Sequence, residues 1–171
     1  RETGQLDNTL ILFASDNGGC AEEMSATMSA AEKAARKMPE KTRDGRPIRY
    51  GNLPAVAPGP EDTYQSYSAN WAHVSNTPFR RYKHWVHEGG IASPLILHLP
   101  GRIGAGQWNH RPSHMIDIFP TLAKLARTAP AKPVEGFDLL APAPPGRKLY
   151  WEHEGNQAIL DGDWKLVREH G

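Results

Sequence analysis

The fold expected for this sequence follows from one stretch, TLILFASDNGGCAE, which runs from Thr9 to Glu22. Its first six residues are apolar or β-branched and do not alternate with polar residues. That pattern is typical of a strand buried on both faces of a parallel sheet. The strand leads directly into Ser-Asp-Asn-Gly-Gly. Because α/β sheets bind their ligands beyond the carboxyl ends of the strands, we expect Asp16 and Asn17 to lie at a ligand site.

The residue types at this strand end suit a metal ion. Asp16 and Asn17 offer a carboxylate and an amide oxygen, which are ligands that Ca²⁺ or Mg²⁺ prefers. Gly18 and Gly19 permit a positive φ and a close approach of the backbone to a ligand. The alternative is a hairpin turn at Asn-Gly, but the residues that follow, CAEEMSATMSA, predict a helix instead of a return strand. Ca²⁺ takes about six to eight oxygens, so further ligands must come from outside this stretch.

Composition narrows the class of protein. The 171 residues are 39% hydrophobic and carry a formal net charge of +1, so the chain can bury a core and has no marked basic excess for nucleic acid. No window approaches the ~18 consecutive apolar residues of a membrane span. Cys20 is the only cysteine, which excludes an internal disulfide. The opening residues RETGQLDN contain no signal peptide, and a start without methionine suggests a fragment or a processed chain.

Residues 1–141 predict an α/β layer, which the family resemblance described below implies is the C-terminal portion of a catalytic domain. The expected elements, in chain order, are a helix over 21–38 that ends at Pro39, a long loop over 39–62, a short helical or irregular segment over 64–75, a buried strand over 91–99, and a helix capped by Ser113 that runs through MIDIFPTLAKLAR. In that last helix the residues Ile116, Phe119, Leu122, Ala123 and Ala126 form an apolar face, and Pro120 falls in the first turn. Asp117 is expected to cap or pair locally.

Residues 142–171 predict the beginning of a small antiparallel sheet subdomain. After the APAPPG run, strands are expected over 148–153, 156–160 and 164–168, joined by glycine-containing turns that are typical of hairpins. Trp151 and Trp164 are expected in the core of this sheet.

A basic cluster precedes the strand expected over 91–99. The stretch NTPFRRYKHWVHEGGIASPLILHLPG, residues 76–101, holds five basic or imidazole side chains within eight positions, followed by a flexible Glu-Gly-Gly turn. Lys83 is a compact cation suited to an anionic oxygen. A solvated basic loop is the alternative, and the segment alone does not decide between the two.

Taken in order, these motifs resemble a known family. SDNGG, then NTPFRRYKHWVHEGGIASPLILHLPG, HMIDIFPTLAKLA, EGFDLL and LYWEHEGNQAILDGDWKLV resemble the C-terminal part of a bacterial arylsulfatase, in the sulfatase branch of the alkaline phosphatase superfamily. The resemblance covers nearly the whole chain, and its specificity comes from the ordered set of motifs, which includes K-x-x-x-x-E-G-G beginning at Lys83. It implies a partial alkaline-phosphatase-like αβα sandwich followed by the start of a small C-terminal antiparallel sheet.

The resemblance also implies site residues and chemistry. Asp16 and Asn17 would ligate one divalent cation, generally Ca²⁺, and Lys83 would bind the sulfate group. His153 in WEHEG would reach the rim of the substrate site. The cation and the lysine would neutralise sulfate oxygens during S–O cleavage. The substrate would be a sulfated small molecule or a sulfated glycan, and a periplasmic or secreted location is expected.

The family's nucleophile is a formylglycine, made from Cys or Ser in a C/S-x-P/A-x-R motif. No such motif occurs in these 171 residues, and Cys20, which is followed by Ala-Glu-Glu-Met, does not match it. The resemblance therefore predicts a sulfuric ester hydrolase whose nucleophile lies outside this chain, and a chain that is inactive alone. Two alternatives stay open: a phosphodiesterase or phosphonate hydrolase of the same superfamily, and a non-catalytic binding or assembly module.

Overall fold

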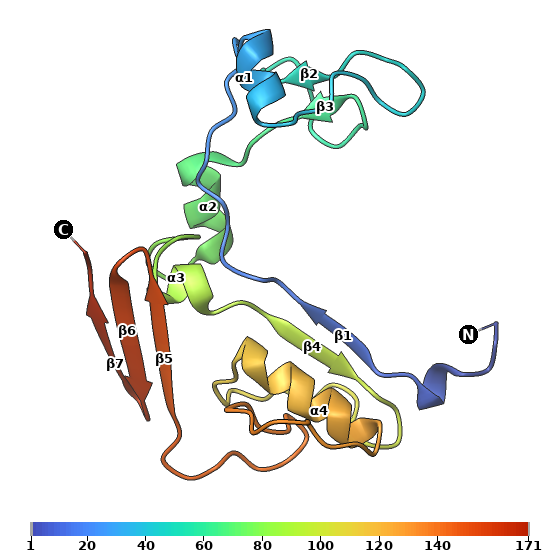
Figure 1. Cartoon of the computed structure of the whole chain (residues 1–171), viewed down its shortest axis with the longest axis vertical. Helices are drawn as coiled ribbons and strands as arrows, with labels where there is room; N and C mark the ends of the chain where they lie inside the picture. The colour runs from blue at the N-terminus through green and yellow to red at the C-terminus, as the bar shows by residue number, and fades with distance from the viewer. Residues whose placement is uncertain (1, 171) are drawn as a thin grey trace. The chain divides into compact units, whose positions relative to one another are not determined.

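The computed structural model describes residues 2–170 and has a mixed α/β fold that forms two compact units (Figure 1). The first unit comprises Arg1–Phe13 and Ile96–Gly171, and the second comprises Ala14–Leu95. The predicted α/β class is confirmed. The boundary expected between residues 141 and 142 stays a prediction.

The second unit holds short helices and one small pair of strands: α1 (Ala30–Ala35), β2 (Arg49–Tyr50), β3 (Thr63–Tyr64), α2 (Ser68–Asn76) and α3 (Glu88–Ile91). The first unit holds η1 (Leu6–Asn8), η2 (Met115–Asp117), α4 (Ile118–Leu125), β5 (Lys148–His153), β6 (Asn156–Asp161) and β7 (Trp164–Arg168). Strands β1 (Ile11–Ala14) and β4 (Leu95–His98) each contain residues of both sets, because the division falls after Phe13 and after Leu95. None of the helices within residues 2–170 has the length and apolar character of a membrane span.

Strands β1 and β4 form where buried strands were predicted, but they are not buried. They pair as a two-stranded sheet, and their arrows point in opposite directions in Figure 1. Phe13 is 60% exposed and Ile96 is 59% exposed. The expectation of strands buried in a parallel sheet is therefore wrong for residues 2–170. An apolar run predicts that its side chains will be buried by other elements. Within the part of the chain that the structure describes, no element buries the exposed side chains of these two strands.

The helix expected over 21–38 is also much shorter than predicted. Only Ala30–Ala35 is helical, and it begins at a capping box in which the Glu32 amide donates to Ser29 Oγ and the Ser29 amide donates to Glu32 Oε2. The residues before this helix do not form helical hydrogen bonds. The Met24 amide, for example, donates to Ser66 Oγ at 2.6 Å. A tertiary hydrogen bond thus overrides the helix propensity of the segment.

The long loop over 39–62 is irregular, as predicted, except at β2 in its middle. There β2 pairs in parallel with β3, with Arg49 opposite Thr63. The Arg49 guanidinium donates to the Asp62 carboxylate at 2.7 Å. A single bridge also joins Lys41 and Pro47. The helical segment expected over 64–75 is present as α2.

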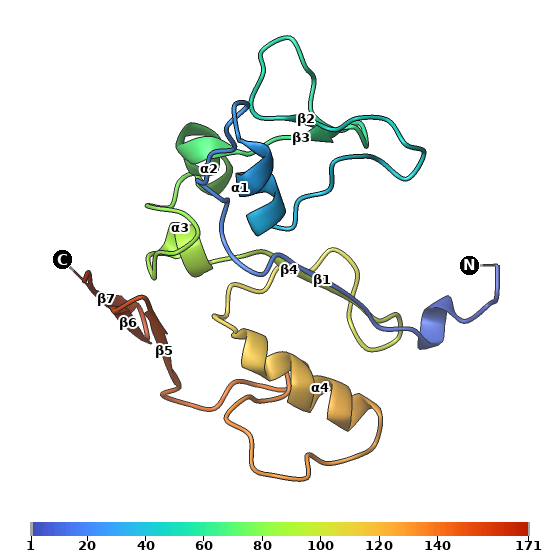
Figure 2. The same cartoon turned by 45° about the horizontal axis from the view of Figure 1, so that its top comes forward.

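Helix α4 follows the short η2 turn, and the segment after α4 folds back along it (Figure 2). The cap is His114, whose ring nitrogen accepts from the Ile116 amide, so the expectation of Ser113 as the cap is wrong. Pro120 lies in the first turn, as predicted. The predicted apolar face is exposed in part: Phe119 is 56% and Leu122 is 45% exposed, whereas Ala123 is buried.

The buried residues of α4 are Ala123 and Thr121, and Thr121 extends a buried polar network that begins at Asp117. Thr121 is buried, donates to the Asp117 carbonyl and accepts from the Leu139 amide at 2.8 Å. Asp117 is fully buried, and its carboxylate accepts from both terminal nitrogens of Arg147 at 2.7 and 2.8 Å. It also accepts from the His114 amide, so the expected local cap exists, but the Arg147 pair was not predicted. These bonds, and not an apolar stripe, attach the returning segment to the helix.

Burial of Asp117 favours its neutral form, but the Arg147 guanidinium and two backbone amides outweigh that effect and hold the pKa of Asp117 below its ordinary value. Burial, with Arg147 adding to it, lowers the pKa of His114 despite the nearby Asp117 charge. Asp117 is therefore a structural carboxylate, which only the fold identifies.

The C-terminal sheet confirms the predicted hairpins. Strands β5, β6 and β7 pair antiparallel in that order, with Leu149 opposite Leu160 (Figure 1). Leu149 and Ala158 are buried on one face. Trp164, however, is 85% exposed, so its expected place in the core is wrong. It pairs with Asp161 on the opposite, exposed face, because side chains alternate along a strand.

Candidate functional site

The SDNGG loop begins immediately after β1, as predicted, and lies in the second unit. Asp16 is exposed and Asn17 is half-buried. Both side chains carry oxygen atoms of the kind that Ca²⁺ prefers. Two such residues fit part of a coordination shell of about six to eight oxygens.

The backbone of this loop is joined to the basic segment expected to bind an anion. The Gly18 amide donates to the Gly90 carbonyl at 2.9 Å, and the Lys83 amide donates to the Gly19 carbonyl at 3.1 Å. These two bonds hold the loop that carries Asp16 against the segment that carries Lys83. The structure thus brings together two site elements separated by more than 60 residues of sequence.

Three glycines make this close approach possible. A Cβ on Gly18 would lie 1.7 Å from the Gly89 carbonyl oxygen, and one on Gly90 would lie 1.9 Å from the Trp85 carbonyl oxygen. Gly89 is equally crowded against the Arg81 carbonyl oxygen, at 2.0 Å. The Glu-Gly-Gly segment is therefore a buried helical turn, α3, and not the flexible turn that was predicted.

Asn76 is a further positioning residue that the sequence reading missed. Its side-chain oxygen accepts from the Gly19 amide at 3.0 Å, and its side-chain nitrogen donates to the Arg81 carbonyl at 3.1 Å. The amide therefore connects the SDNGG loop to the basic segment. The signal available in the sequence was its place at the beginning of NTPFRRYK, which by itself does not distinguish a structural amide from a turn residue.

Lys83 and His84 both contact one carboxylate. Lys83 Nζ and His84 Nε2 each lie 3.4 Å from Glu22 Oε1. The hydrogen bond to Glu22 raises the pKa of Lys83, and electrostatic interaction with that carboxylate adds to the rise. In turn, hydrogen bonds from His84, Cys20 and Lys83 lower the pKa of Glu22. The structure thus gives Lys83 a cationic ammonium group beside an ionised carboxylate.

A groove of about 650 Å³ opens next to this ion pair within the second unit. Glu22 belongs both to the ion pair and to the wall of the groove. The wall is formed by two stretches and the residue that follows α1, namely Cys20, Glu22, Glu23, Met24, Arg36, Tyr64, Gln65, Ser66 and Tyr67. Cys20 is half-buried here. It precedes an irregular segment, so its expected place at a helix start is wrong.

The other basic and imidazole side chains of the segment have aromatic neighbours. The Arg81 guanidinium lies 4.1 Å from the centre of the Trp85 ring, and the rings of Trp85 and His87 meet edge to face at 6.1 Å. The His73 ring similarly contacts Tyr82, at 5.0 Å. These contacts support structural roles for the two histidines.

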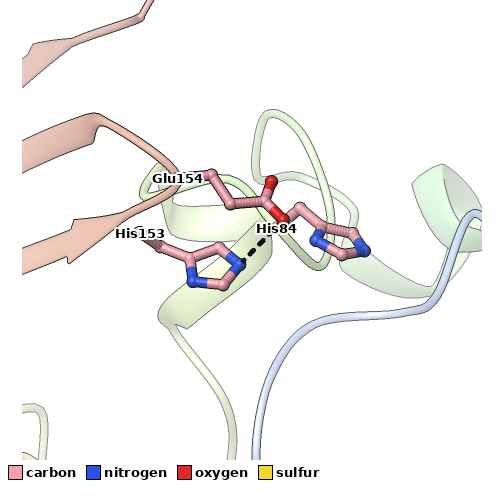
Figure 3. Close-up of side chains that lie close together, drawn as sticks. All are labelled: His84, His153 and Glu154. Carbon is pink, nitrogen blue, oxygen red and sulfur yellow. Dashed lines mark ion pairs between the residues drawn. The ribbon is translucent and has the colours of Figure 1, made fainter.

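His153 lies at the end of β5, at the turn into β6 in the first unit. Its Nε2 lies 3.7 Å from Glu154 Oε1, as the dashed line in Figure 3 marks, and its side chain is 55% exposed. The assignment of His153 to the rim of a substrate site stays a prediction.

Comparison with known proteins identifies the family. The family model described as "Sulfatase" matches residues 1–128. A sulfatase of Schizosaccharomyces pombe described as uncharacterised is 28% identical over 180 residues, which cover 96% of this chain and 30% of the relative. The arylsulfatase of Klebsiella aerogenes is 29% identical over 133 residues, covering 77% of this chain and 26% of the relative.

The N-acetylgalactosamine-6-sulfatase of Canis lupus familiaris is 36% identical over 99 residues, covering 53% of this chain and 19% of the relative. The chain thus spans less than a third of the length of these three relatives. Because the family model covers most of its residues, the chain belongs to the sulfatase family.

Proposed function

We propose that this chain supplies a metal-binding and sulfate-binding part of the active site of a sulfuric ester hydrolase. The observation that carries the proposal is the pair of backbone bonds from Gly18 to Gly90 and from Lys83 to Gly19. They place the Asp16–Asn17 loop and the Lys83 segment in one compact unit. Membership of the sulfatase family favours a sulfate ester over the phosphate or phosphonate substrates of related hydrolases.

The roles of the chain's own residues follow from their chemistry. Asp16 and Asn17 hold one divalent cation, generally Ca²⁺, together with ligands from outside this chain. That cation, when bound, neutralises charge on sulfate oxygens. Lys83, held as a cation by Glu22, binds a sulfate oxygen and stabilises the negative charge that develops as the S–O bond breaks. The nucleophile is a formylglycine outside these 171 residues.

We also propose a substrate class and a cellular location, and both rest on similarity to known sulfatases alone. The relatives include an arylsulfatase and an N-acetylgalactosamine-6-sulfatase, so the substrate class is a sulfated small molecule or a sulfated glycan. An arylsulfatase type of activity rests on the likeness of the sequence motifs. A periplasmic or secreted location has the same basis.

Calcium titration calorimetry of the 171-residue chain tests the metal site. Because Asp16 and Asn17 offer two of about six to eight ligands, we expect weak binding that the Asp16→Ala, Asn17→Ala variant loses. The chain contains a matched control, since Asp7 and Asn8 form a second Asp-Asn pair ahead of β1. The Asp7→Ala, Asn8→Ala variant should bind like the wild type. Binding that survives in the first variant, or falls equally in both, would overturn the assignment.

A further inference from the structure

Glu22 contacts Lys83, the proposed sulfate-binding residue, and also lines the groove. Its Oε1 lies 3.4 Å from Lys83 Nζ, and its side chain forms part of the groove wall. A sulfate group bound at Lys83 therefore lies close to a carboxylate. If an ester binds Lys83 through its sulfate group and extends its organic group into the groove, that organic group lies beside Glu22, because Glu22 both contacts Lys83 and lines the groove.

The effect of this carboxylate depends on the charge of the ligand. A sulfate monoester carries one negative charge near neutral pH, whereas inorganic sulfate carries two. Repulsion between unit charges scales with the product of the charges. Glu22 therefore opposes the binding of inorganic sulfate about twice as strongly, in free energy, as it opposes the binding of the ester.

The groove suits an uncharged organic group. The rings of Tyr64 and Tyr67 are 42% and 45% exposed, and they offer faces on which a ring can pack. Gln65 and Ser66 add hydrogen-bonding side chains beside them. The second carboxylate of the wall, Glu23, disfavours a further negative charge on the ligand.

We propose that Glu22 is a specificity-determining residue, which shifts the preference of the Lys83 site away from the doubly charged sulfate ion and towards a singly charged sulfate ester with an uncharged organic group in the groove. The inference rests on the proposed function, because it assumes that Lys83 binds sulfate. It assigns to Glu22 a role in turnover, since a site that binds inorganic sulfate weakly releases that product readily.

The experiment measures dissociation constants for sodium sulfate and for 4-nitrophenyl sulfate by NMR titration of the 171-residue chain. The Glu22→Gln variant keeps the size of the side chain and removes its charge. We expect both anions to bind more tightly to this variant than to the wild type. The ratio of the two dissociation constants should shift about fivefold in favour of inorganic sulfate. This size follows from the interaction of two unit charges about 4 Å apart in water, because inorganic sulfate carries one more unit charge than the ester. That shift should shrink as NaCl is raised from about 0.01 M to about 1 M, which a purely structural effect would not do.

Two further variants separate the possible outcomes. Glu23→Gln is the matched control, because Glu23 lines the same groove without a contact to Lys83 among the ion pairs that the structure gives, and it should leave the ratio near its wild-type value. If Lys83→Met weakens the binding of both anions but Glu22→Gln leaves the ratio of the two dissociation constants unchanged, the inference on Glu22 is wrong and the proposed function still holds. If Lys83→Met binds both anions as the wild type does, the proposed function fails, and the inference fails with it.

Discussion

At the scale of single residues, the candidate site depends on glycines that allow backbone to meet backbone. Gly18 has no room for a side chain, since an added Cβ would lie 1.7 Å from the Gly89 carbonyl oxygen. The Gly18 amide also donates the bond to Gly90 that joins the two site segments. The atoms that this methyl group would meet belong to the backbone, so no side-chain rotation can make room for it. An alanine at position 18 must therefore push the two segments apart.

We expect Gly18→Ala to lower the free energy of unfolding by about 1–3 kcal/mol or more and to shift the amide resonances of the Lys83 segment. Thermal unfolding and a two-dimensional NMR spectrum measure the two effects. Gly104→Ala is the control, because its Cβ would meet nothing closer than 3.4 Å. Equal melting temperatures for wild type and Gly18→Ala would show that the loop does not dock as described.

At the scale of elements, η2 and α4 are held by a buried ion pair in place of a packed apolar face. Removal of one partner from such a pair leaves a buried charge without compensation, which costs about 3–5 kcal/mol. Asp117→Asn should therefore destabilise the chain at pH 7 by about that amount in chemical denaturation. Asp161→Asn is a suitable control, because Asp161 pairs with Lys148 at the surface and its loss should change the unfolding free energy little.

The same carboxylate gives the stability a pH dependence of known sign. The pKa of Asp117 is lowered in the folded chain, so the unfolded chain binds a proton more readily. Its contribution is fully present above the ordinary pKa of about 3.9 and is lost as the pH falls through the lower, folded value. Acid titration of wild type and Asp117→Asn checks this, and identical acid profiles would contradict it.

At the scale of the whole molecule, the chain carries proposed metal and sulfate ligands but no C/S-x-P/A-x-R motif. We therefore expect the purified 171-residue chain to release no sulfate from 4-nitrophenyl sulfate, with or without Ca²⁺. A complete arylsulfatase serves as the positive control. Release that follows the chain through successive purification steps and disappears in Lys83→Met would mean that a different nucleophile operates here.

Local signals predicted part of the fold well. The hairpins over 148–168 were recognised because glycine turns and short strands are encoded by neighbouring residues. The position of Asp16 and Asn17 at the end of a strand followed from the abrupt change from TLILFA to SDNGG. The prediction of a long helix over 21–38 was wrong, since backbone groups of this segment bond to distant residues: the Met24 amide donates to Ser66 Oγ, and the Glu22 carbonyl accepts from the Ser68 amide.

The sequence by itself determined the family, the strands of the C-terminal sheet and the candidate ligands Asp16, Asn17 and Lys83. The strands and the candidate ligands rest on residue types within short stretches, and the family rests on the order of several such motifs along the chain. Only the tertiary structure decided which residues support those ligands. Glu22 meets Lys83 across 61 residues, and Asp117 meets Arg147 across 30. Such pairs depend on how the chain folds back on itself, and no local pattern of charge or hydrophobicity specifies the partner.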